Sequence, residues 1–435
     1  MYSAYELLNR KRRGEALKDA EIRWLVDSFT AGALPDYQMS AFLMAVAIHG
    51  MHEDEMAALT RSMLESGERW NLHNRFDFIA DKHSTGGVGD KVSILLAPWV
   101  AACGVKIGML SGRGLGHTCG TIDKLDAIPR FNARLTREQL ERCIDEVGCA
   151  IATSTKGIAP ADQKMYGLRD VTGTVESLPL ITASIMSKKL AMGASALVLD
   201  VKTGSGAFMH EYESSLALAR SLIAAAKGSG TRVEALITDM DRPLGTAAGN
   251  ANEIRESIEC LRTGEPDVLL QVTRELGVRV LVMSGKFDDS SAGKALDDAR
   301  KSGAALDAMR RWIAAQGGDP EIVDRLDRLA LPTITIDVRA PRSGFLSKMD
   351  TYALGMLAVD LGAGRHKYDD AIDSAAGILF DRKSGDEVSA GEVIARLQIG
   401  KRPADDDEVR ARYLAAIEFA DGPPPARPLV HEHLF

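Results

Sequence analysis

Residues 76–111 read "FDFIADKHSTGGVGDKVSILLAPWVAACGVKIGMLS", and this stretch decides the fold. Residues 76–80 alternate apolar side chains as a strand does, and 92–104 read as a helix that ends at glycine. Residues 105–111 then read as a second strand. A strand, a helix and a strand in this order predict a βαβ unit with a parallel sheet. The glycine-rich residues 81–91 precede the helix, where free backbone N–H groups favour an anion.

Two further glycine loops support a ligand site. The second predicted strand runs into "SGRGLGHTCGTID" (residues 111–123), and a strand in "SALVLDVKTG" (residues 195–204) runs into a third glycine turn. Loops that follow parallel strands share one edge of the sheet, where open α/β folds bind ligands. Neither of the first two loops has the spacing of a Walker loop or a dinucleotide fingerprint. Residues 80–124 carry five basic and three acidic side chains, which suits a small anion.

The composition is that of an ordinary soluble globular chain. The 435 residues are 45% hydrophobic and 26% charged, enough for two or three domains. The net charge of −8 argues against nucleic acid or an anionic membrane as partner. The longest apolar run, residues 94–105, is too short to span a bilayer, which takes about 20 residues. The start has no signal-peptide core, and the five cysteines have no metal spacing, so we expect a cytoplasmic protein.

The periodicity predicts three structural regions. Residues 1–67 and 160–193 have helical spacing and predict a discontinuous all-α lobe. Residues 70–159 and 194–333 predict an α/β domain with a mixed, largely parallel sheet that carries the anion site. Residues 334–435 predict a small α+β module that resembles a lipoyl domain but lacks the attachment lysine, so we interpret it as structural. The ligand cleft is expected between the helical lobe and the α/β domain.

Four long motifs carry a family resemblance. They are "DKHSTGGVGDK" (81–91), "SGRGLGHTCGTIDKLD" (111–126), "YGLRDVTGTVESLPLITASIMSKKLA" (166–191) and "DVKTGSGAFM" (200–209). In this order they resemble the pyrimidine nucleoside phosphorylases, and among these the thymidine-preferring members most. The resemblance runs from about residue 1 to 430. It implies a homodimer formed through the helical lobe, which transfers a pentosyl group between a pyrimidine and phosphate, giving free base and α-pentose 1-phosphate. Inorganic phosphate is a co-substrate, and no cofactor is implied.

The resemblance also assigns site residues. The phosphate-binding residues are Lys82, Ser84, Ser93, Ser111 and Thr121. The pyrimidine-binding residues are His83, Tyr166, Arg169, Ser184 and Lys188. Lysine and hydroxyl donors suit phosphate, while Arg169 and Lys188 would stabilise negative charge on the departing base. His83 would share a proton with a ring carbonyl, because its unperturbed pKa is ~6.5. The alternative for the hydroxyls is that they only cap the following helices.

Two positions depart from what the family shows elsewhere. Some relatives bind potassium, and Gly89, Leu244, Ala247 and Glu256 match that pattern, but Lys91 stands where those relatives have threonine. The ammonium of Lys91 could replace the ion, so we expect no potassium and no other metal.

The second position is Met109, where members that accept uridine carry lysine. A thioether is at most a weak acceptor, so burying a ribose 2′-OH beside it would cost roughly 1–3 kcal/mol. We therefore predict a preference for thymidine and deoxyuridine over uridine. The alternatives are that Met109 only fills the core and that the enzyme uses uridine as well.

Two other functions fit parts of the pattern. A phosphoribosyltransferase related to anthranilate phosphoribosyltransferase would have this fold and a similar glycine loop, but it would need Mg²⁺ and acidic ligands. A nucleoside-binding protein without activity would have the same residues but no turnover. Release of thymine from thymidine and phosphate separates the phosphorylase from both.

Overall fold

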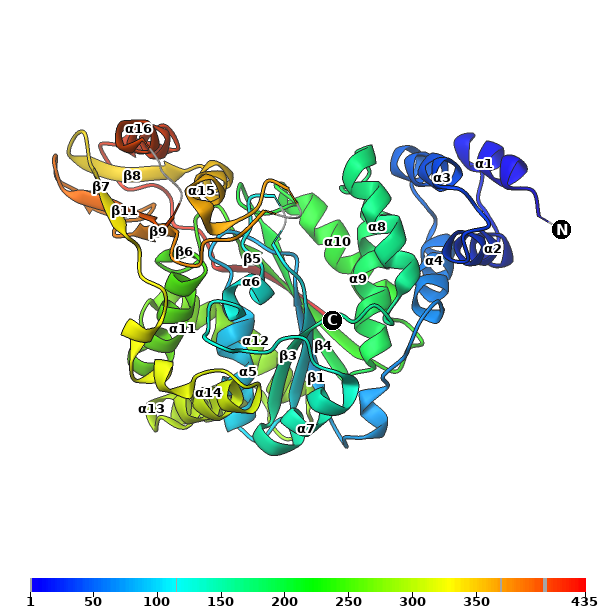
Figure 1. Cartoon of the computed structure of the whole chain (residues 1–435), viewed down its shortest axis with the longest axis horizontal. Coiled ribbons are helices and arrows are strands. Elements are labelled where there is room, and N and C mark those ends of the chain that lie inside the picture. Colours follow the sequence, from blue (N-terminus) through cyan, green and yellow to red (C-terminus); the bar gives the residue numbers. More distant parts are fainter. Residues whose placement is uncertain (1, 115, 368–369, 402–404) are drawn as a thin grey trace.

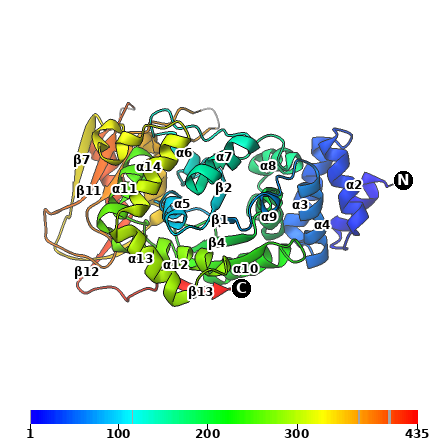
Figure 2. The ribbon, with the colours of Figure 1, turned by 90° about the horizontal axis from the view of Figure 1, so that it is seen from below.

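The computed structural model describes residues 2–114, 116–367, 370–401 and 405–435. A helical lobe lies at one end of the long axis, an α/β domain lies in the middle, and a small strand-rich module lies at the other end (Figure 1). The view from below shows the same order (Figure 2). The predicted fold class is therefore confirmed.

The main sheet has the strand order β13-β5-β4-β1-β2-β3. Its strands are β1 (Ala80–Ser84), β2 (Ile107–Ser111), β3 (Cys149–Thr153), β4 (Ala196–Thr203), β5 (Arg232–Asp239) and β13 (Val430–Leu434). Only β13, at the edge beside β5, runs antiparallel to its neighbour. The carboxyl ends of β1, β2 and β4 therefore meet at one edge, and the loops that follow them lie together.

The first strand lies later than the sequence predicted. We expected it over residues 76–80, but the ladder with β4 runs from Ala80 to Ser84. The apolar alternation of 76–80 comes from a turn in which Phe76 is buried, and periodicity alone does not separate such a turn from a strand. As a consequence, Lys82, His83 and Ser84 stand on a strand and not in a loop.

Helices of the α/β domain pack against the main sheet or against one another. They are α5 (Val92–Ala102), α6 (Thr121–Leu125), α7 (Arg137–Val147), α10 (Tyr212–Ala225), α11 (Ala251–Thr263), α12 (Asp267–Met283), α13 (Asp289–Lys301) and α14 (Ala304–Ala315). Helix α5 is apolar on all sides and buried from Val92 to Val100, as expected for a helix enclosed by the sheet and by α12 and α14. Short turns of 3-10 helix lie at Leu72–Asn74, Pro320–Val323 and Leu326–Arg328.

The helical lobe is discontinuous in sequence. It contains α1 (Ala4–Arg12), α2 (Asp19–Thr30), α3 (Asp36–His49), α4 (Glu53–Glu65), α8 (Pro160–Thr172) and α9 (Leu178–Met192). Apolar side chains of α8 and α9, such as Met165 and Leu180, share one core with the first four helices. The residue boundaries that we predicted for the three regions remain predictions.

The chain crosses between the helical lobe and the α/β domain three times: after α4, before α8 and after α9. Backbone hydrogen bonds join these crossings side by side. Glu68 N donates to Gly157 O at 2.7 Å, and Trp70 N donates to Ala191 O at 2.7 Å. His73 N, a little further along the chain, donates to Gly193 O at 2.9 Å.

The C-terminal module has its own core and two small sheets, of order β10-β8-β12 and β6-β9-β11-β7. Its strands are β7 (Ile334–Arg339), β8 (Gly344–Met349), β9 (Gly377–Phe380), β10 (Glu387–Val388), β11 (Val393–Ile399) and β12 (Ile417–Ala420). Its helices are α15 (Thr351–Ala358), which continues as a π-helical turn at Val359–Ala363, and α16 (Asp406–Ala415). Strand β6 (Ala247–Gly249) comes from the α/β domain and pairs with β9, so backbone hydrogen bonds dock the module. None of the helices in the described residues is both long and apolar enough to cross a membrane.

Candidate active site

A cavity of about 660 Å³ lies where the carboxyl edge of the main sheet faces α8 and α9. Every residue that the family resemblance assigned to phosphate or pyrimidine lines it. These residues are Lys82, His83, Ser84, Ser93, Ser111, Thr121, Tyr166, Arg169, Ser184 and Lys188. The first six come from the α/β domain and the last four from the helical lobe. The cavity therefore lies between the two parts of the molecule.

Lys82 is the centre of the α/β side of the cavity. Its side chain is buried, and Nζ donates to Ser93 Oγ at 3.2 Å. Nζ also lies 3.5 Å from Oδ2 of Asp200 on the neighbouring strand β4. Asp200 in turn pairs with Lys202 at 2.8 Å, so two ammonium groups share one buried carboxylate. Positive charge is thus held at the cavity wall, where it suits an anion.

The hydroxyl groups lie around Lys82. Ser84 Oγ donates to Asp90 and accepts from Gly86 N at 3.1 Å. Burial alone would raise the pKa of Asp90, but the charges of Lys82, Lys202 and Lys124 outweigh it and hold the pKa well below its usual range. Asp90 is therefore ionised. Its carboxylate accepts a hydrogen bond from the hydroxyl of Ser84 and so fixes the orientation of that hydroxyl.

Helix spacing places the helical-lobe residues on shared faces. Tyr166 and Arg169 are three residues apart on α8, and Ser184 and Lys188 are four apart on α9. Lys188 Nζ donates to Ser184 Oγ at 3.2 Å and to Oδ2 of the buried Asp162 at 2.7 Å. Asp162 thus holds the ammonium of Lys188 at the cavity wall, four residues before Tyr166.

Arg169 has a second set of contacts that the sequence did not predict. Its side chain is buried, and it donates to Thr174 O at 3.2 Å, Val175 O at 2.7 Å and Leu180 O at 3.0 Å. Its guanidinium lies 5.5 Å from the ring centroid of Tyr166. Arg169 therefore holds the α8–α9 connection in shape as well as lining the cavity.

His83 is half-buried between the two groups of residues. Burial, together with the charges of Lys189, Lys82 and Lys188, holds the pKa of His83 well below its usual value. The imidazole of the unliganded enzyme is therefore neutral at neutral pH. It can donate one N–H hydrogen bond, but the premise of a pKa near 6.5 does not hold here.

Buried ions that the sequence did not predict, Lys189 and Asp81, lie at and behind the cavity wall. Lys189 Nζ donates to Asp81 Oδ1, Lys82 O and Leu110 O, each at 3.0 Å, and so joins α9 to β1 and β2. Burial raises the pKa of Asp81 to about 6 despite this lysine. A usable signal was present on β4, because Asp200 and Lys202 interrupt an otherwise apolar strand.

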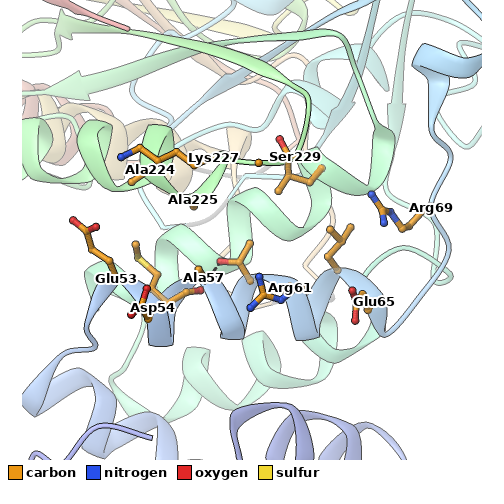
Figure 3. A pocket seen from close by; sticks show the side chains of 15 residues that line it. Glu53, Asp54, Ala57, Arg61, Glu65, Arg69, Ala224, Ala225, Lys227 and Ser229 are labelled. Carbon is orange, nitrogen blue, oxygen red and sulfur yellow. Dashed lines mark hydrogen bonds between the residues drawn. The ribbon is translucent and has the colours of Figure 1, made fainter. Parts of the chain in front are cut away.

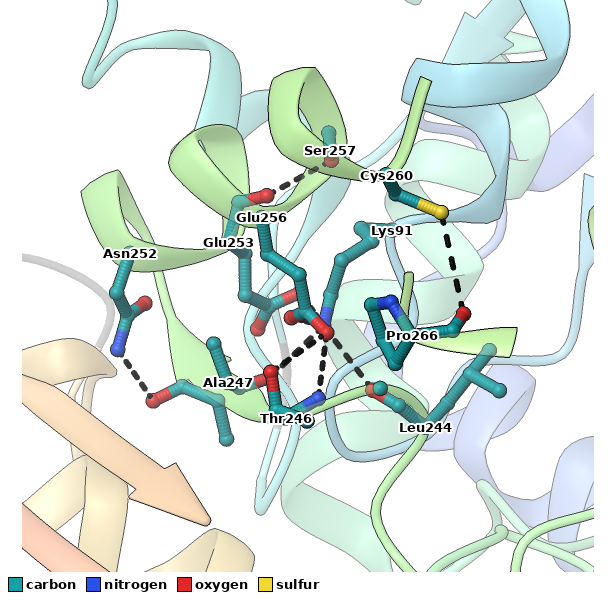
Figure 4. A network of polar contacts seen from close by, with 12 residues as sticks. Lys91, Leu244, Thr246, Ala247, Asn252, Glu253, Glu256, Ser257, Cys260 and Pro266 are labelled. Atoms are coloured by element: carbon teal, nitrogen blue, oxygen red, sulfur yellow. Dashed lines mark hydrogen bonds and ion pairs between the residues drawn. The ribbon is translucent and has the colours of Figure 1, made fainter. Parts of the chain in front are cut away.

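Lys91 occupies the centre of the oxygen atoms that match the family's potassium pattern (Figure 4). Its buried Nζ donates to Leu244 O at 3.0 Å, to Ala247 O at 2.9 Å and to Glu256. A cation in the middle of these oxygens would lie against the ammonium. The residues present therefore do not fit a bound potassium ion.

Gly89 belongs to the same packing. Its φ is +75°, and a Cβ there would lie 2.5 Å from Leu244 O, so only glycine fits this close approach.

Met109 lies next to the cavity but is not one of the described residues that line it. It is fully buried on β2, two residues before Ser111. This position agrees with core filling, the alternative stated above, as well as with an indirect effect on sugar choice.

A second, smaller groove of about 340 Å³ lies between α4 and the end of α10 (Figure 3). Acidic side chains such as Glu53 and Asp54 and basic ones such as Arg61 and Lys227 line it together. It contains none of the glycine-loop residues. The larger cavity is therefore the candidate active site.

Comparison with known proteins shows which family the chain belongs to. The family model described as "Glycosyl transferase family, a/b domain" matches residues 77–306, and the corresponding helical bundle domain matches residues 5–67. The model described as "Pyrimidine nucleoside phosphorylase C-terminal domain" matches residues 345–420. The fold and the site thus define a glycosyltransferase.

Two curated relatives show the particular family. A pyrimidine-nucleoside phosphorylase of Staphylococcus aureus (strain MSSA476) is 42% identical over 96% of both chains. A pyrimidine-nucleoside phosphorylase of Geobacillus stearothermophilus is 39% identical over 99% of both chains. The chain belongs to the pyrimidine-nucleoside phosphorylase family of pentosyltransferases. The solved structure of anthranilate phosphoribosyltransferase from Thermus thermophilus has a TM-score of 0.57 and 19% identity, over 72% of this chain and 99% of that one, and it shows the fold alone.

Proposed function

We propose that this enzyme catalyses the reversible phosphorolysis of pyrimidine nucleosides, giving the free base and α-pentose 1-phosphate. The observation that carries the proposal is the cavity itself. It brings Lys82 and its hydroxyl neighbours on the α/β side to face Tyr166, Arg169, Ser184 and Lys188 on the helical side. A phosphate and a planar base each find suitable donors there.

The proposed mechanism follows from this arrangement. Phosphate held by Lys82 attacks the anomeric carbon while the bond to the base breaks, and the bonding electrons move onto the pyrimidine. Lys188 and Arg169 stabilise the negative charge on the ring, and the neutral His83 donates a hydrogen bond to a ring oxygen. The departing base then takes up one proton, which balances the proton that hydrogen phosphate gives up when it becomes the dianionic sugar phosphate.

Incubation with thymidine and inorganic phosphate tests the proposal. We expect free thymine and an acid-labile sugar phosphate in equal amounts, and no reaction when phosphate is left out. A protein that instead uses phosphoribosyl pyrophosphate with an aromatic amine would be the phosphoribosyltransferase considered above. A protein that binds thymidine without turnover would be a binding protein.

We further propose that the enzyme is of the thymidine phosphorylase type and prefers deoxynucleosides. The support is Met109, which stands two residues before Ser111 at the position where, by the family resemblance, members that accept uridine carry lysine. Since Met109 does not line the cavity, its effect on the sugar would pass through Leu110 and Ser111, which do. The alternative is a broad enzyme that uses uridine equally well.

We propose that Lys91 takes the place of a monovalent cation, so that the enzyme needs no metal or other cofactor. An ammonium with two carbonyl oxygens and a carboxylate around it supplies the single positive charge that an alkali ion would bring. The Nζ atom of Lys91 also lies 3.9 Å from Oε2 of Glu253. Because the ammonium belongs to the side chain of Lys91, it cannot dissociate from the site as a bound ion can.

We propose a homodimer that forms through the helical lobe, with no nucleic-acid or membrane partner. Four large apolar side chains there are mostly exposed: Tyr5 on α1 (74%), Tyr37 (74%) and Ile48 (69%) on α3, and Val171 on α8 (77%). Tyr37 and Ile48 are eleven residues apart, which is close to three helical turns, so they share a face. Such a patch suits a second copy of the chain.

Light scattering after size exclusion tests the dimer. We expect twice the monomer mass for the wild type and the monomer mass for Tyr37→Asp/Ile48→Asp. We also place the enzyme in the cytoplasm, where thiols stay reduced, and the five cysteines are free in the structure.

A further inference from the structure

One buried carboxylate organises the loop that carries two of the phosphate donors. Asp123 lies in the first turn of α6, two residues after Thr121, and its side chain is 1% exposed. It accepts from Arg113 Nη1 and Gly114 N, both at 2.7 Å. These two residues follow Ser111 at the end of β2. Asp123 therefore joins the two ends of the loop, one beside Ser111 and the other beside Thr121.

The third partner of Asp123 comes from the other end of the sequence. Arg365, which follows the π-helical turn of the C-terminal module, donates from Nη2 to Asp123 Oδ1 at 3.0 Å. Its side chain is 18% exposed, so the pair is shielded from water more than a surface ion pair is. Arg365 Nε also donates to Asp370 O at 3.2 Å, which fixes the orientation of the guanidinium.

The segment that precedes Arg365 contacts the same loop at other points. Ala363 O accepts from Cys119 Sγ at 3.4 Å and from Asn250 Nδ2 at 2.8 Å. Gly355 on α15 packs so closely that a Cβ there would lie 2.5 Å from His117 O. The module thus contacts this loop from His117 to Asp123. Yet none of the described residues beyond Leu218 lines the cavity.

We propose that Arg365 is a positioning residue for phosphate, acting through Asp123. Its charge and its Nη2 donor hold the Asp123 carboxylate in the orientation that binds Gly114 N and Arg113 together. The loop then presents the hydroxyls of Ser111 and Thr121 to one anion. The proposal rests on the function proposed above and gives the C-terminal module a role in substrate binding.

Kinetics of Arg365→Gln test this role. We expect the KM for phosphate to rise about tenfold, while the KM for the nucleoside stays within about twofold and the thermal midpoint changes little. Arg365→Lys keeps the charge and should recover part of the loss. The matched control is Arg396→Gln, which breaks an ion pair with Asp381 (2.9 Å) inside the same module and should leave both KM values unchanged.

A double-mutant cycle then separates positioning from general loosening. If Arg365 acts through Asp123, Arg365→Gln should add almost nothing to the phosphate KM of Asp123→Asn. Calorimetric titration with inorganic phosphate alone should show the same pattern in Kd without any turnover. Additive effects, equal rises in both KM values or an unchanged phosphate KM would overturn the proposal. A wild type that does not split thymidine would overturn the proposed function instead, and the phosphate titration would still decide the role of Arg365.

Discussion

Lys82 and Asp200 lie on the neighbouring parallel strands β1 and β4, with Nζ and Oδ2 3.5 Å apart. Lys202 lies closer to the same carboxylate, at 2.8 Å. One carboxylate therefore faces two ammonium groups, and the more distant one, Lys82, also lines the cavity. The ionised carboxylate of Asp90 also attracts both ammonium groups. Lys82 is the cation of this charged cluster that an entering phosphate meets at the cavity wall.

The first prediction concerns this charge. Lys82→Met should lower turnover on the order of 10²-fold and raise the KM for phosphate, since a charge-assisted contact is lost. The variant should still fold, because the buried carboxylate of Asp200 keeps its ion pair with Lys202. The matched control is Lys11→Met, which removes a buried ammonium from Glu55 (2.8 Å) in the helical lobe and should cost stability without changing the phosphate KM. Normal phosphate kinetics in Lys82→Met would remove this lysine from the site.

The second prediction concerns the pH behaviour of His83. Since its pKa in the folded enzyme lies well below its usual value, the unfolded chain takes up a proton below about pH 6.5 that the folded enzyme does not. This histidine therefore lowers stability as the pH falls through that range. In a titration with ¹⁵N-labelled histidine, the His83 signal, identified with His83→Asn, should stay constant from pH 8 to pH 6.

Bound phosphate should move that titration upward, because a dianion favours imidazolium. A His83 signal that titrates near pH 6.5 in the free enzyme would contradict the neutral donor in the proposed mechanism.

The third prediction concerns the sugar. We expect kcat/KM for thymidine and deoxyuridine to exceed that for uridine, by ~10²-fold at most, because apolar sites reject an added hydroxyl only modestly. Met109→Leu should keep this ratio and Met109→Lys should reduce it. Since Met109→Lys buries an ammonium, its thermal midpoint must be measured alongside. Equal efficiency of the wild type on deoxyuridine and uridine would show that the preference is absent.

The fourth prediction concerns Lys91. Wild-type activity and thermal stability should be the same in potassium chloride and in choline chloride. Lys91→Thr should lose stability in choline and recover it with potassium, since the oxygens of Leu244, Ala247 and Glu256 would then be free to bind the ion. Lys11→Thr, the control, should lose stability without any response to potassium. A wild type that is activated by potassium would contradict the proposal.

The fifth prediction concerns closure. Phosphate and base donors stand on different parts of the molecule, so both ligands together should draw the helical lobe toward the α/β domain. Small-angle scattering with phosphate and a non-reactive pyrimidine analogue should show a smaller radius of gyration than either ligand alone. Lys82→Met should not respond to phosphate. Superimposable curves with and without both ligands would argue for a rigid cleft.

Local patterns in the sequence predicted much of this molecule. Glycine loops after successive strands pointed to the sheet edge where the cavity lies, and the ten residues that the family resemblance assigned to phosphate and pyrimidine all line that cavity. The strand at residues 80–84 was placed too early because a buried turn imitated its alternation. The contact of Arg365 with Asp123 spans 242 residues, and neither side chain differs in sequence from an ordinary surface charge. Such pairings depend on docking, which periodicity does not encode.

The three crossings between the helical lobe and the α/β domain have a consequence for mechanics. A single linker would let the lobe rotate freely about it. Three adjacent connecting segments resist such a rotation, because hydrogen bonds such as that from Glu68 N to Gly157 O hold them together. They leave bending about one line as the easiest movement. The lobe should therefore move as a rigid body about a single hinge axis. Each closure toward the α/β domain should then return the base donors to the same position.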